Sequence, residues 1–139
     1  MTPEEMKQAY IEYRLQRARE SLEAAQLLTD RGMYSEAVSR MYYACFYAVN
    51  ALLYYNGMSA KRHGGVQALF NRHFVRTGQV SKDFGRLYND LFDLRQQSDY
   101  EDLYRPNPDE VRQMIPQVEA FIEAISRLIE STITDEATS

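Results

Sequence analysis

The sequence has no tryptophan, a single cysteine, and few glycines and prolines, with six and four in 139 residues. A lone cysteine excludes a disulfide within the chain and favours a reducing compartment. The longest nearly uncharged run, residues 41–55, is too short to cross a bilayer and is rich in tyrosine, which is typical of a buried helix. The acidic N-terminus lacks the apolar segment of a signal peptide. We therefore expect a cytoplasmic protein that does not enter a membrane.

Composition and charge indicate an ordinary globular protein, with 45% hydrophobic residues and a net charge of -4. The length suits one core, so we expect one domain over residues 1–133 and a polar tail at 134–139. The charge is uneven, because residues 61–95 hold seven Lys or Arg and three acids, whereas residues 96–139 hold three and ten. This pattern indicates either a local anion-facing surface or the solvated faces of two different helices.

The spacing of apolar residues predicts five helices and no strand pair. Thr2-Pro3 and Asn107-Pro108, each followed by acids, predict the starts of the first and last helices, and Ser81 can cap the fourth. The second helix, residues 34–56, has an apolar surface too wide for one neighbour, so it is central or lies at a subunit contact. Pro116 should kink the last helix rather than end it. Short turns between these helices predict an all-α, up-and-down antiparallel bundle.

The end of the fourth helix combines Arg95 with an apolar stripe. The stem of Arg95 can pack while its guanidinium reaches a cleft. In one interpretation, Arg95 pairs with Asp99 four residues on to hold the helix end, and Tyr100 lies in the core. In the other, Arg95 contacts a phosphate beside a group that transfers a proton.

A basic loop precedes the third helix and contains Lys61, Arg62 and His63, followed by Gly64 and Gly65. Free backbone N–H groups at a helix start, glycines that permit close approach and two cations all favour an anion. The alternative is a flexible loop that happens to be basic. The sequence does not indicate whether His63 lies near Arg95.

The second helix carries Arg40, which could pair with an acid of the first or last helix. One face of the same helix contains polar and aromatic residues that could stack a base or close a subunit contact, and we favour the contact: Tyr43, Tyr47, Asn50 and Tyr54. No Cys/His cluster has metal-ligand spacing and no phosphate-binding glycine loop is present, so we expect neither a metal nor a cofactor.

Four stretches, in matching order, resemble the small prokaryotic HEPN-domain proteins over about residues 8–130. They are Ser-Arg-Met-Tyr-Tyr-Ala at 39–44, Lys-Arg-His-Gly-Gly at 61–65, Phe-Val-Arg-Thr-Gly at 74–78 and Leu-Arg-Gln-Gln-Ser-Asp-Tyr at 94–100. The resemblance implies a helical bundle that often dimerises with its motif arginines near the dimer cleft. It also implies pairing with a minimal nucleotidyltransferase in a toxin–antitoxin system, and the active relatives are metal-independent endoribonucleases.

In the motif that the resemblance implies, Arg95 matches the arginine of Arg-x4-6-His, and Gln96 matches the polar residue that often follows it. Tyr100 stands where the histidine belongs, and this departure argues against ribonuclease activity. In the toxin branch, a tyrosine two residues past that histidine can be adenylylated. Asp102 occupies this position here, so Tyr100 or Tyr104 would have to serve.

Two functional hypotheses follow from the sequence, beside the plain alternative that the arginines only stabilise a bundle. The first is a homodimeric HEPN subunit, joined through the second helix and the motif region, that works with a minimal nucleotidyltransferase. It would bind a nucleotide or RNA through polar and charged residues of the loop and motif: Arg40, Lys61, Arg62, His63, Gln96 and Asp99. The alternative is a metal-independent endoribonuclease toxin in which Arg95 acts with His63 or Tyr100.

Overall fold

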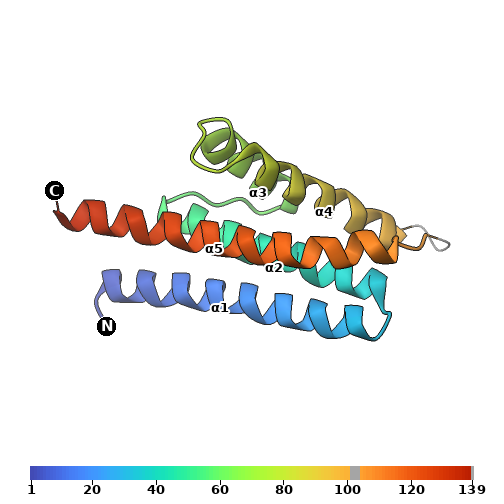
Figure 1. Ribbon diagram of the computed structural model, residues 1–139. Coiled ribbons are helices and arrows are strands. Elements are labelled where there is room, and N and C mark those ends of the chain that lie inside the picture. Colours follow the sequence, from blue (N-terminus) through green and yellow to red (C-terminus); the bar gives the residue numbers. More distant parts are fainter. Residues whose placement is uncertain (101–103, 139) are drawn as a thin grey trace.

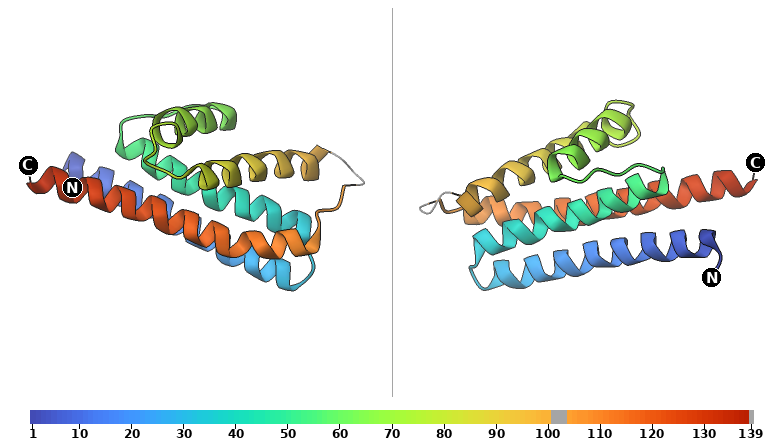
Figure 2. Two further views of the ribbon diagram at one scale, coloured as in Figure 1. Left: turned by 45° about the horizontal axis from the view of Figure 1, so that its top comes forward. Right: turned by 180° about the vertical axis from the view of Figure 1, so that it is seen from behind.

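The computed structural model describes residues 1–100 and 104–138, which form five α-helices and one π-helical segment (Figure 1). In chain order these are α1 (Pro3–Asp30), α2 (Tyr34–Tyr55), α3 (His63–Phe70), η1 (Asn71–Val75), α4 (Lys82–Tyr100) and α5 (Pro108–Thr138). α1 and α4 run in one direction, and α2 and α5 run in the other (Figures 1 and 2). No strand occurs within the described residues. The prediction of an all-α, up-and-down bundle of about five helices is confirmed.

Side-chain caps start three helices where the sequence indicated. The Thr2 hydroxyl accepts a hydrogen bond from the Glu5 N–H at 3.1 Å, and the Glu5 carboxylate accepts one from the Thr2 N–H at 3.4 Å. This reciprocal capping box satisfies two N–H groups that the helix itself leaves unpaired. The Asn107 side chain caps α5 at 3.0 Å from the Glu110 N–H, and Ser81 caps α4 in the same way.

Glycines end α1 and α2. Gly32 and Gly57 have φ angles of 73° and 72°, in the left-handed region that residues with a Cβ rarely adopt. The next N–H groups then bond back to carbonyls of the last turn, from Met33 to Leu28 at 2.9 Å and from Met58 to Leu53 at 2.8 Å. These bonds close each helix and reverse the chain.

α2 is the central helix and packs against α1, α3, α4 and α5, which explains its wide apolar surface. α1 and α2 both carry fully buried alanines, whose small side chains permit close packing of helices: Ala18, Ala25, Ala37, Ala44, Ala48 and Ala51. Cys45 also lies in this core, and burial raises the pKa of its thiol. Within the described ranges, no helix combines the length and apolar character needed to cross a bilayer.

The third helical region differs from the prediction in two ways. α3 begins at His63, before the two glycines rather than after them. Gly65 permits this start, because a Cβ added there would lie 3.0 Å from the Ala60 Cβ. The helix then widens into the π-helical segment η1 from Asn71 to Val75, which a periodicity of 3.6 residues does not predict.

α5 continues through Pro116, which was expected to kink this helix rather than end it, and it extends into the predicted polar tail. The polar tail was expected to begin at residue 134, whereas the structure is helical as far as Thr138. The Tyr55 hydroxyl donates a hydrogen bond to the Glu136 carboxylate, which ties the last turns of α5 to the end of α2. Tyr55 and Glu136 are 81 residues apart, so a local sequence pattern does not predict their contact.

Candidate functional site

Three helices bring five side chains together in what we call the arginine–histidine cluster: Arg40, Tyr42 and Tyr43 of α2, His63 of α3 and Arg95 of α4. The Arg95 guanidinium carbon lies 4.7 Å from the centre of the Tyr42 ring and 5.6 Å from that of Tyr43. The Arg40 guanidinium carbon lies 4.9 Å from the centre of the Tyr43 ring. His63 Nδ1 lies 2.9 Å from the Tyr42 hydroxyl. Two guanidiniums and a histidine therefore all contact the neighbouring side chains of Tyr42 and Tyr43.

His63 is the first residue of α3, and its ring packs against aromatic side chains of α2. The centres of the His63 and Phe46 rings are 4.3 Å apart. Burial, and then the positive charge of Arg95, lower the pKa of His63 below its ordinary value, because protonation would put a second cation in a partly dehydrated place. The imidazole is therefore neutral at pH 7 and able to accept a proton.

Tyr42 holds the His63 ring in position. Burial raises the pKa of Tyr42 to about 12, although Arg95 acts in the opposite direction. The phenol therefore remains protonated at neutral pH, and its oxygen can donate to or accept from Nδ1 of His63. When Nδ1–H donates to the Tyr42 oxygen, Nε2 of His63 is a free base.

The charge of Arg95 is only partly compensated. Its Nη1 lies 3.4 Å from Asp99 Oδ2, so the predicted ion pair is present, with 17% of the Arg95 side chain and 43% of the Asp99 side chain exposed. Such one-turn pairs contribute about 0.3–0.5 kcal/mol. Arg95 Nε is buried and has no hydrogen-bond partner among the described residues, and an unpaired buried donor costs roughly 1–3 kcal/mol. The fold therefore leaves one donor of Arg95 unsatisfied.

Lys61 and Arg62 lie at the entrance to α3 and are both exposed. Arg62 is the N-cap residue of this helix, directly before His63, and no side chain caps the first N–H groups. A Cβ added at Gly64 would meet nothing within 4 Å, so the first turn of α3 is open at this position. The loop therefore presents two cations and a helix start beside His63.

Tyr100 lies on a different face of α4 from Arg95. Arg95 packs onto α2, whereas Tyr100 is 82% exposed. Tyr100 lines a shallow hollow of about 650 Å³ with other residues of its own helix face: Asp93, Gln96 and Gln97. The structure thus brings Arg95 together with His63 and Arg40, and it places Gln96 and Tyr100 elsewhere. The interpretation that Tyr100 belongs to the core is wrong, because its ring projects from the last turn of α4.

The second tyrosine that was considered for modification lies after α4. Tyr104 is half-buried and belongs to the segment that connects to α5. Asp102, which occupies the matching motif position, lies outside the described residues.

Arg40 does not form the ion pair that was considered for it. Among the described residues it has no acidic partner within ion-pair distance, and its guanidinium lies over Tyr43, three residues on in the same helix. Arg40 thus has an aromatic partner one turn along its own helix, where an acidic partner from another helix was considered. The guanidiniums of Arg40 from α2 and Arg95 from α4 both lie over the Tyr43 ring, so this ring brings charged groups of two helices together.

No pattern in the sequence indicated that Tyr42 belongs to the cluster, or that Phe46 and Tyr88 are its aromatic neighbours. Tyr42 and Tyr88 stack with ring centres 6.0 Å apart, and burial raises the pKa of Tyr88 well above its ordinary value. All three residues fit an apolar stripe, and nothing local distinguishes them from ordinary core aromatics. The contact that gives Tyr42 its role is with His63, 21 residues away in the sequence.

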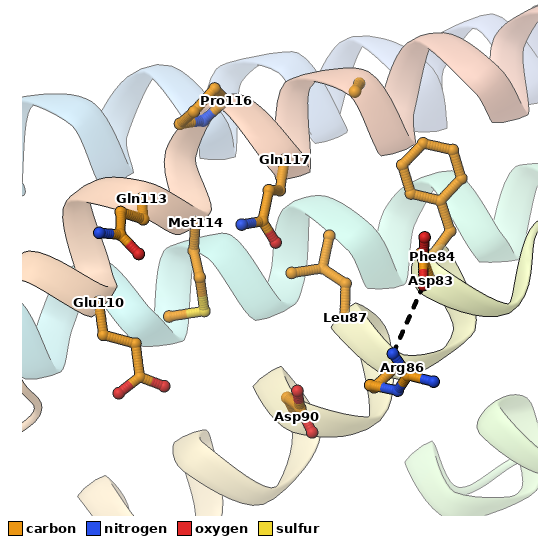
Figure 3. A pocket seen from close by; sticks show the side chains of 11 residues that line it. Asp83, Phe84, Arg86, Leu87, Asp90, Glu110, Gln113, Met114, Pro116 and Gln117 are labelled. Atoms are coloured by element: carbon orange, nitrogen blue, oxygen red, sulfur yellow. Dashed lines mark hydrogen bonds and ion pairs between the residues drawn. The ribbon is translucent and has the colours of Figure 1, made fainter.

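A separate cleft of about 650 Å³ lies between α4 and α5 (Figure 3). Leu87 and Met114 point into it, and Asp90 and Glu110 lie at its rim. This acidic rim disfavours a phosphate, and the lining includes none of the predicted binding residues. In the part of the chain that the structure describes, no three His, Cys, Asp or Glu side chains gather as metal ligands do.

Comparison with known proteins identifies the family to which this chain belongs. The family model of the HEPN domain matches residues 11–128. The chain therefore belongs to the HEPN family, as the four sequence stretches predicted.

Individual relatives share most of their length with this chain. A "UPF0332 protein" of Thermotoga maritima is 45% identical over 124 residues, which cover 89% of this chain and 94% of the relative. A Methanocaldococcus jannaschii protein named "Putative toxin MJ0605" is 32% identical over 116 residues, which cover 84% and 86%. The crystal structure of TT1696 from Thermus thermophilus matches with a TM-score of 0.70 over 85% of this chain and 97% of that one, at 18% identity, which shows a shared fold.

Proposed function

We propose that this protein is the HEPN subunit of a toxin–antitoxin-type pair and that its arginine–histidine cluster binds a phosphate of RNA or of a nucleotide. The proposal rests on the convergence of Arg40 and Arg95 on the Tyr43 ring, beside a neutral His63. Guanidinium groups offer several donors to a phosphate, and of these two arginines only Arg95 has an acidic partner within the described residues. The cations before α3 and its free N–H groups add to the attraction for an anion.

The proposed function includes two protein partners, a second copy of this chain and a minimal nucleotidyltransferase. Membership of the HEPN family and the toxin name of the M. jannaschii relative support a paired system of this kind. Arg95 lies near the end of α4, so a dimer contact through this region would bring two clusters together. Co-expression with the nucleotidyltransferase of a neighbouring reading frame, followed by size-exclusion chromatography, tests both partners.

The binding proposal is tested with a short fluorescent single-stranded RNA and the variants Arg95→Gln and Arg40→Gln. Loss of a charge-assisted hydrogen bond costs about 1.5–3 kcal/mol, so each variant should bind roughly tenfold or more weakly. Arg127→Gln is the control, because Arg127 is exposed on α5 and pairs with Glu123. Affinity of Arg95→Gln equal to that of the control would exclude the cluster as the binding site.

A second candidate is a metal-independent endoribonuclease, which the contact of both His63 and Arg95 with Tyr42 favours. His63 Nε2 would remove the proton of the RNA 2′-hydroxyl, and the 2′-oxygen would attack the adjacent phosphorus. Arg95 would stabilise the additional negative charge, and the 5′-oxygen would leave with a proton from solvent. In this mechanism the base comes from α3 rather than from position 100.

The nuclease candidate predicts cleavage of single-stranded RNA in the presence of a metal chelator, with 2′,3′-cyclic phosphate ends. His63→Gln should abolish this cleavage and leave RNA binding largely intact. Tyr100→Phe should cleave at the rate of the unaltered protein, because Tyr100 faces away from Arg95. Intact RNA at all enzyme concentrations, together with normal binding, would reject the enzyme and retain the binding subunit.

A further inference from the structure

A continuous row of aromatic rings and guanidinium groups extends from the cluster along the face shared by α1 and α2. We call it the tyrosine–arginine stripe, and it consists of Tyr10, Arg14, Arg17, Tyr47 and Tyr54. The ring centres of Tyr10 and Tyr54 are 4.4 Å apart, and the Arg14 guanidinium lies 5.1 Å from Tyr10 and 5.6 Å from Tyr47. The Arg17 guanidinium lies 5.2 Å from the Tyr47 ring.

The stripe joins the arginine–histidine cluster without a break. The Tyr47 and Tyr43 ring centres are 6.0 Å apart, and Tyr43 carries both Arg40 and Arg95. Four guanidiniums from three helices therefore lie along one line of tyrosine rings. The line runs from the end of α4, along the middle of α1 and α2, towards the start of α1.

The tyrosines hold the stripe arginines in place and leave most of their donors unused. Arg14 Nε donates to the Tyr10 hydroxyl at 2.9 Å, and Arg17 Nη2 donates to the Tyr47 hydroxyl at 3.3 Å. Each guanidinium has five N–H donors. Among the described residues, neither Arg14 nor Arg17 has an acidic partner within ion-pair distance.

The two acids of α1 that lie nearest in sequence to Arg14 and Arg17 do not pair with them. Glu12 lines a groove between α1 and α5 on the other side of the helix. Glu20 accepts a hydrogen bond from Gln16 and acts on Arg17 only from beyond ion-pair distance. The stripe is therefore a cationic surface in a protein whose net charge is -4.

These features favour a single-stranded nucleic acid over the other anions that an arginine surface attracts. Exposed bases stack on aromatic rings and on guanidinium planes, while phosphates accept from the free N–H groups. A duplex hides its bases from such a surface. A two-fold contact through the stripe itself is disfavoured, because the partner's stripe would supply the same tyrosines and arginines and no carboxylate. The second copy of the proposed function would instead make its contact at the end of α4.

We infer that the tyrosine–arginine stripe is a track for single-stranded RNA that continues from the arginine–histidine cluster towards the start of α1. The inference rests on the proposed function for the anchoring of one end of the strand in the cluster. Beyond the proposed function, it predicts a longer binding site for RNA. A dinucleotide occupies the cluster alone, and a longer strand also contacts Arg14 and Arg17.

The test compares a uridine dinucleotide with an oligouridylate of about 12 nucleotides, a length within the range of single-strand sites. In the double variant Arg14→Gln, Arg17→Gln, affinity for the longer strand should fall roughly tenfold or more, and the salt slope should decrease by about 1.4, the value for two lost phosphate contacts on a single strand. Affinity for the dinucleotide should not change. The control is Arg86→Gln, Arg127→Gln, which removes the same charge from exposed sites on α4 and α5.

The outcomes separate the stripe from the cluster. Equal affinity of the two double variants for the longer strand would overturn the track. A changed sedimentation equilibrium of the stripe variant, with unchanged RNA binding, would also overturn it and make the stripe a contact between copies. If the unaltered protein binds the longer strand through Arg14 and Arg17 but Arg95→Gln has no effect, the cluster proposal fails and the track stands.

Discussion

Among single residues, Arg95 acts on the pKa of two neighbours in the same direction, because its positive charge disfavours a protonated imidazole and favours a deprotonated phenol. Its positive charge lowers the pKa of His63, adding to the larger effect of burial, and it partly counteracts the burial that raises the pKa of Tyr42. The guanidinium thus helps to keep the imidazole uncharged, whereas burial keeps the phenol protonated in spite of the nearby cation. The His63–Tyr42 hydrogen bond therefore joins two neutral groups at neutral pH, directly beside a permanent cation.

Arg95→Gln should raise the pKa of His63, because the nearby positive charge that disfavours imidazolium is removed. The pKa should remain below about 6.5, since burial continues to disfavour the charged form. Nuclear magnetic resonance titration of the histidine ring signals measures this shift. Arg86→Gln, which changes an exposed arginine of the same helix, is the control. An unchanged or lowered value in Arg95→Gln would contradict the close contact.

Among the helices, the approach of α4 to η1 depends on the absence of one side chain. A Cβ added to Gly85 would lie 2.9 Å and 3.1 Å from the two methyl groups of Val75. Gly85 is buried in the first turn of α4, so this contact sets where α4 starts relative to η1. Because Arg95 lies near the other end of α4, the direction of this helix determines whether Arg95 reaches Tyr42.

Gly85→Ala should destabilise the fold by about 1–3 kcal/mol through overpacking, partly offset by the better helix propensity of alanine. The double change Val75→Ala, Gly85→Ala should recover part of this loss, because it removes the methyl groups that clash. Gly64→Ala is the matched control and should stabilise by roughly 0.5–1 kcal/mol, since nothing lies within 4 Å of the added Cβ. Urea denaturation measures all three, and a neutral Gly85→Ala would contradict the packing.

The helices were largely predictable from the sequence because their signals are local. Thr2, Asn107 and the glycines that follow α1 and α2 mark boundaries that the structure reproduces. The start of α3 and the length of α5 were not predictable, because they depend on contacts with Ala60 and Tyr55 from other segments. A local pattern contains no information about such partners.

The contacts of the site likewise include local ones, which the sequence predicts, and long-range ones, which it does not. The Arg95–Asp99 pair spans one helical turn, so sequence spacing was enough to predict it. The contacts of Arg95 and His63 with Tyr42 join three helices, and a single sequence does not specify how these helices cross. Candidate residues could therefore be named from chemistry alone, while their grouping required the fold. The separation of Tyr100 from Arg95 likewise followed only from the face of α4 on which each lies.

Across the whole molecule, His63 links the stability of the fold to pH. Its pKa in the folded protein is below the ordinary value that applies to the unfolded chain, so the unfolded chain binds the proton more tightly. This contribution to stability is fully present above about pH 6.5 and is lost as the pH falls through the folded-state value.

His63→Gln should flatten the dependence of unfolding free energy on pH around and below the ordinary histidine pKa of about 6.5, because glutamine does not titrate and its amide can still bond to Tyr42. Urea midpoints at several pH values in this window, for the unaltered protein and the variant, measure the difference. Parallel curves for the two proteins would show that His63 titrates as freely in the folded protein as in the unfolded chain.

The complete burial of Cys45 has a practical consequence for spectroscopy. Its thiol is buried on the central helix, and its raised pKa keeps it in the unreactive protonated form. The unaltered chain therefore behaves as a cysteine-free background towards maleimides. A cysteine introduced at exposed Lys61 would take up a dye or spin label selectively, which allows distances to bound strands or to a neighbouring copy to be followed without first redesigning the interior.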